Sequence, residues 1–265
     1  MISFRYIFAD AEILVRCNNC KSYNDATPSP PGPYQIDSDL LDHIRSLMSN
    51  GLSTRNKLFI QFQNMGLQDP RISLAAHLLD VACCVFLNFT LLKENLRHAS
   101  WWESHGFGTA LQAGIVPGLL ENYMVMETGS LMFFSFSLFE SGIRRVVREI
   151  DSAACSGGSA EFKSIYEWLF ARLRKTGWNY PSGNPSLFLD LFRTFRNTLH
   201  NNGAFYPPAG NNQEIEWNGK SYQFQYGGVP PFTGWEFNLM LLQELVSLNY
   251  SIMTSQLVSN LPIIL

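Results

Sequence analysis

Two long, mainly apolar stretches set the first constraint on the fold of this chain. They cover residues 81–92 and 131–139, and charged side chains close each of them. Both are shorter than the roughly 18 apolar residues that a membrane-spanning helix needs, so we expect buried helical segments and no membrane span. At 265 residues, the chain is long enough to enclose them in a hydrophobic core without disulfides or a metal.

The surface of the protein is expected to be poor in charge. Charged residues make up 15% of the chain and the net charge is -3, whereas a typical soluble domain has about a quarter of charged residues. Part of the exterior should therefore be covered by a partner, and a second copy of the chain is the simplest one. The slight acidity argues against broad binding of duplex DNA or anionic membrane, but it leaves room for a small basic site.

The cysteines and the first residues favour a cytoplasmic protein. Five cysteines, two of them adjacent at Cys83 and Cys84, suit free thiols better than a disulfide framework. Acidic residues interrupt the N-terminal stretch where a signal peptide would be continuously apolar. Cys17 and Cys20 form a single CxxC, which we interpret as a turn with two thiols rather than a zinc site, because no second ligand pair follows at usable spacing. We expect no metal and no cofactor.

Hydrophobic periodicity predicts a mainly α-helical protein. Short strands are expected within residues 2–17 and a loop over residues 21–35, and alternation around Asn218–Gly219 predicts a β-hairpin before the last helix. Helices are expected over residues 37–50, 72–98, 109–127 with an interruption at Pro117, 131–151, 161–175, 186–200 and 235–258.

The breaks between the expected helices suggest how the chain is divided into domains. Thr128–Gly129 is interpreted as a boundary between an N-terminal region, residues 1–128, of short strands and helices and a C-terminal unit, residues 129–258. Apolar continuity across residues 109–139 favours the alternative of one compact unit.

The helix expected over residues 186–200 carries the main functional signal. At about 100° per residue, its phenylalanines and most of its leucines fall on one side, and Arg193, Arg196, Asn197 and His200 share an arc of about 100° on the other. Arginine offers a charged fork that fits a phosphate, and histidine titrates near neutral pH. No acid is expected near the centre of this face to neutralise the arginines. The alternative is an ordinary solvated face on which His200 caps the last carbonyls.

The stretch FRTFRNTLHNNG, together with the earlier helix LMFFSFSLFESGIRRVVREI, resembles the HEPN (higher eukaryotes and prokaryotes nucleotide-binding) superfamily of helical bundles over about residues 129–258. HEPN proteins commonly carry an Arg, four to six residues and then a His, often with a polar residue directly after the Arg. Here Arg193 has the spacing to His200 but is followed by Thr194. Arg196 has the polar neighbour, Asn197, but only three residues separate it from His200.

The resemblance implies a HEPN-like bundle whose ribonuclease members cleave RNA without a metal, at a site formed where two such helices meet across a dimer. The protein would then be a homodimeric endoribonuclease or RNA-binding component of a toxin or defence system. His200 would act as general acid and base, Arg193 or Arg196 would hold the scissile phosphate, and Asn197 would orient one of these groups.

Glu140 would either support this site or mark the solvent side of its helix. The alternative function, also found among HEPN domains, is a non-catalytic dimerisation or interaction module in which the polar face is only a dimer seam.

Overall fold

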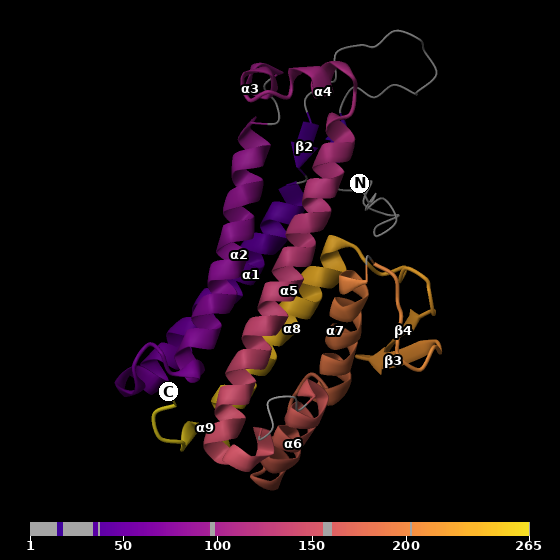
Figure 1. The fold of residues 1–265 in the computed structure, drawn as a ribbon. Helices are drawn as coiled ribbons and strands as arrows, with labels where there is room; N and C mark the ends of the chain where they lie inside the picture. Colours follow the sequence, from indigo (N-terminus) through magenta and orange to yellow (C-terminus); the bar gives the residue numbers. More distant parts are fainter. Residues whose placement is uncertain are drawn as a thin grey trace.

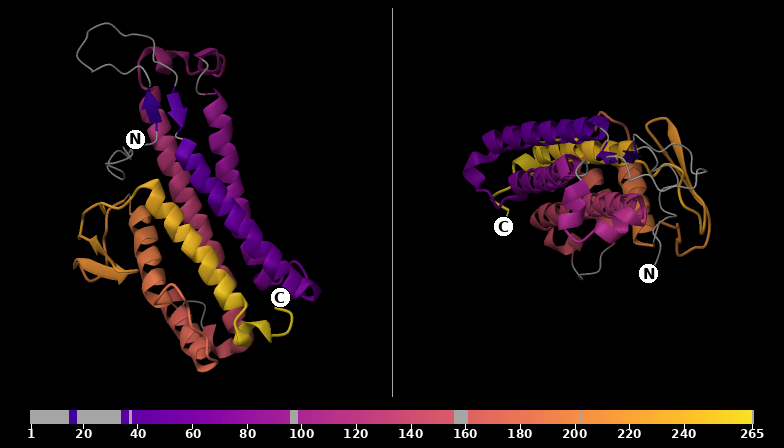
Figure 2. Two further views of the ribbon diagram at one scale, coloured as in Figure 1. Left: turned by 180° about the vertical axis from the view of Figure 1, so that it is seen from behind. Right: turned by 90° about the horizontal axis from the view of Figure 1, so that it is seen from above.

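The computed structural model describes residues 15–17, 34–36, 38–95, 99–155, 161–201 and 203–264. Within them the chain is mainly α-helical, as predicted, with two small antiparallel strand pairs (Figure 1). Four long helices form an elongated bundle in two layers, with α1 and α8 behind α2 and α5 in Figure 1; the views from behind and from above in Figure 2 agree. Their bounds are Ser38–Phe62 for α1, Pro70–Asn95 for α2, Val116–Ile150 for α5 and Trp235–Met253 for α8.

The N-terminal strands only partly follow the prediction. Strand β1 (Val15–Cys17) lies in the stretch expected to be extended, and it pairs antiparallel with β2 (Tyr34–Ile36), whose first two residues were expected in a loop. Pairing across a long connection leaves no local pattern in the sequence, which explains the missed strand. The rest of the predicted strand region, and Cys20 of the CxxC, lie outside the described residues.

Helix α1 continues well past Gly51, where the sequence predicted its end. A β-carbon at Gly51 would lie 3.4 Å from Cδ1 of Leu79, so this residue lies where α1 packs against α2. Packing against α2 offsets the loss of about 1 kcal/mol that glycine costs a helix relative to alanine. The 3-10 turn η3 (Gln63–Met65) follows, and Gly66 adopts a left-handed φ of 86° before α2 begins.

Helix α2 contains the first of the two apolar stretches. Most of its first half is buried, but Leu87 and Leu91 in its second half are more than half exposed. The sequence predicted that this stretch was too short to cross a membrane. The helix that contains it spans 26 residues, and among the described residues it is the one helix that is long and apolar enough to do so by length and composition.

Helix α5 is a single helix across the predicted boundary at Thr128–Gly129, so the helix break expected there is wrong. Thr128 is buried, and its hydroxyl donates to the carbonyl of Met124 at 2.8 Å, which keeps it within the helix. Pro117 begins α5 rather than interrupting it, because the first turn of a helix needs no backbone N–H from that residue. The short helices α3 (Ala99–Ser104) and α4 (Gly108–Gln112) precede it. Regions 1–128 and 129–258 therefore share α5, and one buried hydrophobic cluster includes residues of both.

The C-terminal half follows the sequence pattern most closely. Helices α6 (Phe162–Lys175) and α7 (Pro185–His200) confirm their predictions. Strands β3 (Gln213–Trp217) and β4 (Lys220–Phe224) form the predicted hairpin, with positive φ angles of 51° at Asn218 and 72° at Gly219. The last predicted helix is divided, because α8 ends at Met253 and the Ser255 side chain caps a separate short helix, α9 (Gln256–Ser259).

A buried ion pair joins the C-terminal segment to the start of α2. Asp69 directly precedes the helix, and its carboxylate accepts a hydrogen bond from the backbone N–H of Arg71 at 2.9 Å. The Arg71 guanidinium, whose side chain is fully buried, donates to the two Asp69 oxygens at 2.9 and 2.7 Å. It also donates to three carbonyls of the C-terminal segment, those of Val258, Leu261 and Pro262.

Candidate functional site

Helix α7 holds the predicted site residues on a rigid base. Its start is fixed by Asn184, whose side chain accepts a hydrogen bond from the backbone N–H of Ser186 at 3.0 Å. Its apolar side packs on three other elements. Phe188 contacts Trp217 of the hairpin at 5.3 Å between ring centroids, Phe192 contacts Phe136 of α5 at 5.1 Å, and Phe195 contacts Phe237 of α8 at 5.1 Å. The polar side is thereby turned outward, beside α5 and α6.

Two acids neutralise Arg193. Its Nη1 donates to Oε1 of Glu161, just before α6, at 3.4 Å, and its Nη2 lies 3.5 Å from Oδ1 of Asp190. Asp190 also accepts hydrogen bonds from the Tyr166 hydroxyl at 2.6 Å and from Nζ of Lys163 at 2.9 Å. Burial and the bond to Asp190 raise the pKa of Tyr166 far above its usual range, so this hydroxyl stays a donor. The prediction that no acid lies near the centre of this face is wrong.

Arg196 is placed differently. Its guanidinium carbon lies over the rings of Phe133 and Phe136 of α5, at 5.1 and 5.4 Å from their centroids. Its Nη1 donates to Oδ1 of Asn197 at 3.2 Å. Within the described part of the chain, Arg196 forms no ion pair. The rings of Phe133 and Phe136 thus stabilise its positive charge by cation–π contacts, and this charge remains available to an anion.

His200 lies beside Arg196, at the end of α7. Its ring centroid is 4.6 Å from that of Phe133, in an edge-to-face contact. Partial desolvation lowers the pKa of His200 below its ordinary value, and the positive charge of Arg196 lowers it further. The imidazole is therefore mainly neutral at pH 7. It forms no hydrogen bond with the described residues, and the last carbonyls of α7 accept from the backbone N–H groups of Asn201 and Gly203 instead. These contacts therefore do not show His200 capping the helix, which was the alternative interpretation.

Glu140 does not contact the polar residues of α7. Its Oε1 accepts hydrogen bonds from Nε and Nη2 of Arg144, one turn further along α5, at 2.9 and 2.6 Å. The five predicted site residues therefore divide. Arg196 and His200 contact Phe133, and Asn197 is bonded to Arg196; we call these four residues the Arg–His face. Arg193 and Glu140 each belong to a separate ion pair.

Phe133 is the site residue that sequence analysis missed. Nothing in the spacing of the helix expected over residues 131–151 singled it out, and only the packing of α7 on α5 shows that Phe133 touches both Arg196 and His200. Asp190 was also missed, although its position three residues before Arg193 was a readable signal on the same helix face.

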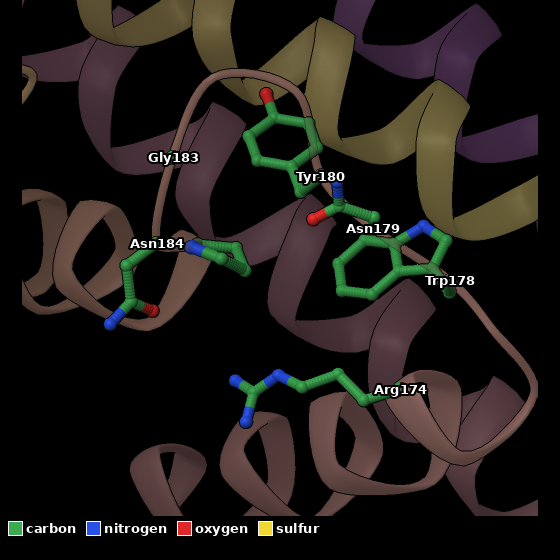
Figure 3. Close-up of a pocket in the computed structure, with 7 residues that line it drawn as sticks. Arg174, Trp178, Asn179, Tyr180, Gly183 and Asn184 are labelled. Carbon is green, nitrogen blue, oxygen red and sulfur yellow. The ribbon is translucent and has the colours of Figure 1, made fainter.

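A separate hollow of about 290 Å³ lies at the other end of α7 (Figure 3). The side chain of Arg174 extends into the space below Asn184. Sixteen helical steps separate Asn184 from His200, or about 24 Å at 1.5 Å per residue, so the hollow is distinct from the Arg–His face. Its lining residues are Arg174, Trp178, Asn179, Tyr180, Gly183, Asn184 and Pro185.

The comparisons with known proteins do not assign the chain to a family. No family model matches the chain, and no curated protein or solved structure shows significant similarity to it. The resemblance to HEPN proteins therefore rests on the residues quoted for it. Among the described residues, no group of three His, Cys, Asp or Glu side chains is placed to hold a metal ion.

Proposed function

We propose that the Arg–His face binds an RNA phosphate and cleaves the RNA chain without a metal, in a cytoplasmic, dimeric, HEPN-like protein of a toxin or defence system. The observation that carries this proposal is the position of the His200 imidazole beside an arginine that forms no ion pair with the described residues, with both side chains in contact with Phe133; the lowered pKa of His200 supports it. A general base must be unprotonated to accept a proton, and a phosphate must meet a positive charge that is not already paired.

The chemistry assigns one role to each group. The His200 imidazole removes the proton of a ribose 2′-hydroxyl, and the 2′-oxygen attacks the adjacent phosphorus. The bond to the 5′-oxygen breaks, and this oxygen takes a proton from water, while the imidazolium formed in the first step releases its proton to the solvent. Arg196 stabilises the negative charge that develops on the phosphate oxygens, and Asn197 keeps its guanidinium in place. The products are a 2′,3′-cyclic phosphate and a 5′-hydroxyl.

This assignment favours one of the two arginines left open by the sequence. Arg193 has the HEPN spacing to His200, but Glu161 and Asp190 already neutralise it. Arg196 has the shorter spacing and the free charge, so we assign the phosphate to Arg196 and a supporting role to Arg193.

The activity can be tested with an unstructured, end-labelled RNA in the presence of a chelator. His200→Ala should reduce the cleavage rate by about 10²- to 10⁴-fold, the usual contribution of a general base. Arg196→Ala should impair cleavage more than Arg193→Ala. The matched control is His105→Ala, because His105 is an exposed histidine that stacks on Trp101 in α3. Equal cleavage by wild type and His200→Ala would remove the imidazole from the mechanism.

The second candidate is a non-catalytic dimerisation or interaction module, and the engagement of Arg193 by two acids favours it. In that case wild-type protein leaves the RNA intact, and no cyclic phosphate is formed. The oligomeric state of wild type and Arg196→Ala, measured by light scattering after size exclusion, then shows whether the face is a dimer seam.

A further inference from the structure

An exposed aromatic ring borders the Arg–His face. Phe134 is 57% exposed, and its ring centroid lies 6.1 Å from that of Phe133 in an edge-to-face arrangement. Phe133 in turn lies 4.6 Å from the His200 ring and 5.1 Å from the Arg196 guanidinium. The half-buried ring of Phe133 thus contacts the imidazole, the guanidinium and the exposed ring of Phe134.

The surroundings of Phe134 leave its ring open to a flat ligand. Its outward neighbours one turn before and after it on α5 are Ser130, which is exposed, and Ser137, which is half-buried. Both side chains are small and hydroxylated. The ring is therefore an exposed apolar platform with hydroxyl groups beside it along the helix. The other apolar side chains on this part of α5 are the half-buried Leu138 and the exposed Met126, eight residues earlier, so the platform is about the size of one planar ring.

The charge of Arg196 indicates which class of ligand could place a planar ring on Phe134. Arg196 offers an anion-binding group that the described residues do not neutralise, so the ligand should combine a planar ring with a nearby negative charge. A nucleotide of a single-stranded RNA has this combination, because its base is free to stack and its phosphate lies next to it. A base within a duplex is stacked on its neighbours and cannot reach the ring.

We infer that Phe134 stacks against an unpaired base next to the phosphate held by Arg196, so that the face accepts single-stranded RNA and excludes duplex RNA. The inference rests on the proposed function and specifies its substrate class.

Fluorescence anisotropy with a short, labelled 2′-O-methyl RNA tests the inference, because an RNA without free 2′-hydroxyls binds but cannot be cleaved by the proposed chemistry. The affinity of the single strand is compared with that of the same strand annealed to its complement, at one fixed salt concentration. Phe134→Ala should weaken binding of the single strand by roughly 5- to 100-fold, the range for loss of one stacked base. Phe134→Trp should retain binding. Phe59→Ala, which removes a comparably exposed phenylalanine (42%) from α1, should have no effect.

The outcomes separate this inference from the proposed function. If wild type binds neither RNA, the proposed function fails and the stacking role fails with it. If Arg196→Ala weakens binding but Phe134→Ala does not, the phosphate site stands and the stacking role is overturned. Equal affinity for single strand and duplex also overturns it. So does a Phe134→Ala variant that loses a dimer while its RNA affinity is unchanged, because the ring is then a contact between copies.

Discussion

Replacing Asp69 by asparagine should lower the free energy of unfolding by about 3–5 kcal/mol, the cost of leaving one member of a buried ion pair without its partner. The carboxylate of Asp69 is the counter-ion of the Arg71 guanidinium, whose side chain has no exposure to solvent. An asparagine of the same shape keeps one acceptor for the backbone N–H of Arg71. Its amide nitrogen is a donor, however, and in the place of Oδ2 it would face two other donors, Nη2 of the guanidinium and the backbone N–H of Ile264.

Urea unfolding followed by circular dichroism at pH 7 measures this loss as a lower midpoint at an unchanged slope. Asp42→Asn is the matched control, because Asp42 pairs with Arg45 on the surface, where the two side chains are 66% and 61% exposed. That variant should lose less than about 1 kcal/mol. A loss below about 1 kcal/mol for Asp69→Asn would contradict this prediction, since the buried pair would then contribute no more than the exposed one.

The pH dependence of the same pair has a defined sign. Burial alone would raise the pKa of Asp69, but its hydrogen bonds with Arg71 and with the backbone of Ile264 outweigh burial and lower that pKa below its ordinary value of 3.8. A carboxyl group whose pKa is lower in the folded state stabilises the protein above its unfolded-state pKa, and this contribution is lost as the pH falls through the folded-state value. The advantage of wild type over Asp69→Asn should therefore be complete near neutral pH and shrink below about pH 4.

Two further predictions concern His200 and the packing of α5. In an NMR titration of the imidazole, the midpoint of His200 should lie below about 6.5, and Arg196→Ala should move it upward; a midpoint at or above that value contradicts the assigned neutral state. Gly142→Ala should cost about 1–3 kcal/mol of stability, because the added β-carbon would lie 2.7 Å from Cδ2 of the buried Leu74 in α2. Gly129→Ala in the same helix, with no atom within 4 Å of the added carbon, should gain up to about 1 kcal/mol, and thermal unfolding that shows a gain at both positions refutes this packing argument.

Local patterns account for the parts of the fold that were predicted correctly. The apolar stripe of α7 and the turn at Asn218–Gly219 both act between residues close in sequence, so they can be read without tertiary information. The errors occurred where long-range packing outweighed a local signal. Gly51 and Gly129 lie inside helices because α1, α2 and α5 support one another across the bundle.

The same division applies to the candidate site. The shared face of Arg193, Arg196, Asn197 and His200 could be predicted from spacing alone, because the direction of a side chain on a helix depends only on its position along the chain. Asp190 lies within reach of Arg193 by its spacing on the same helix, but which arginine keeps its charge available also depends on contacts between helices. Glu161 reaches Arg193 from the start of α6, while Phe133 of α5 supports Arg196 and His200. These partners lie about 30 to 70 residues away along the chain, and only the packing of separate helices brings them into contact.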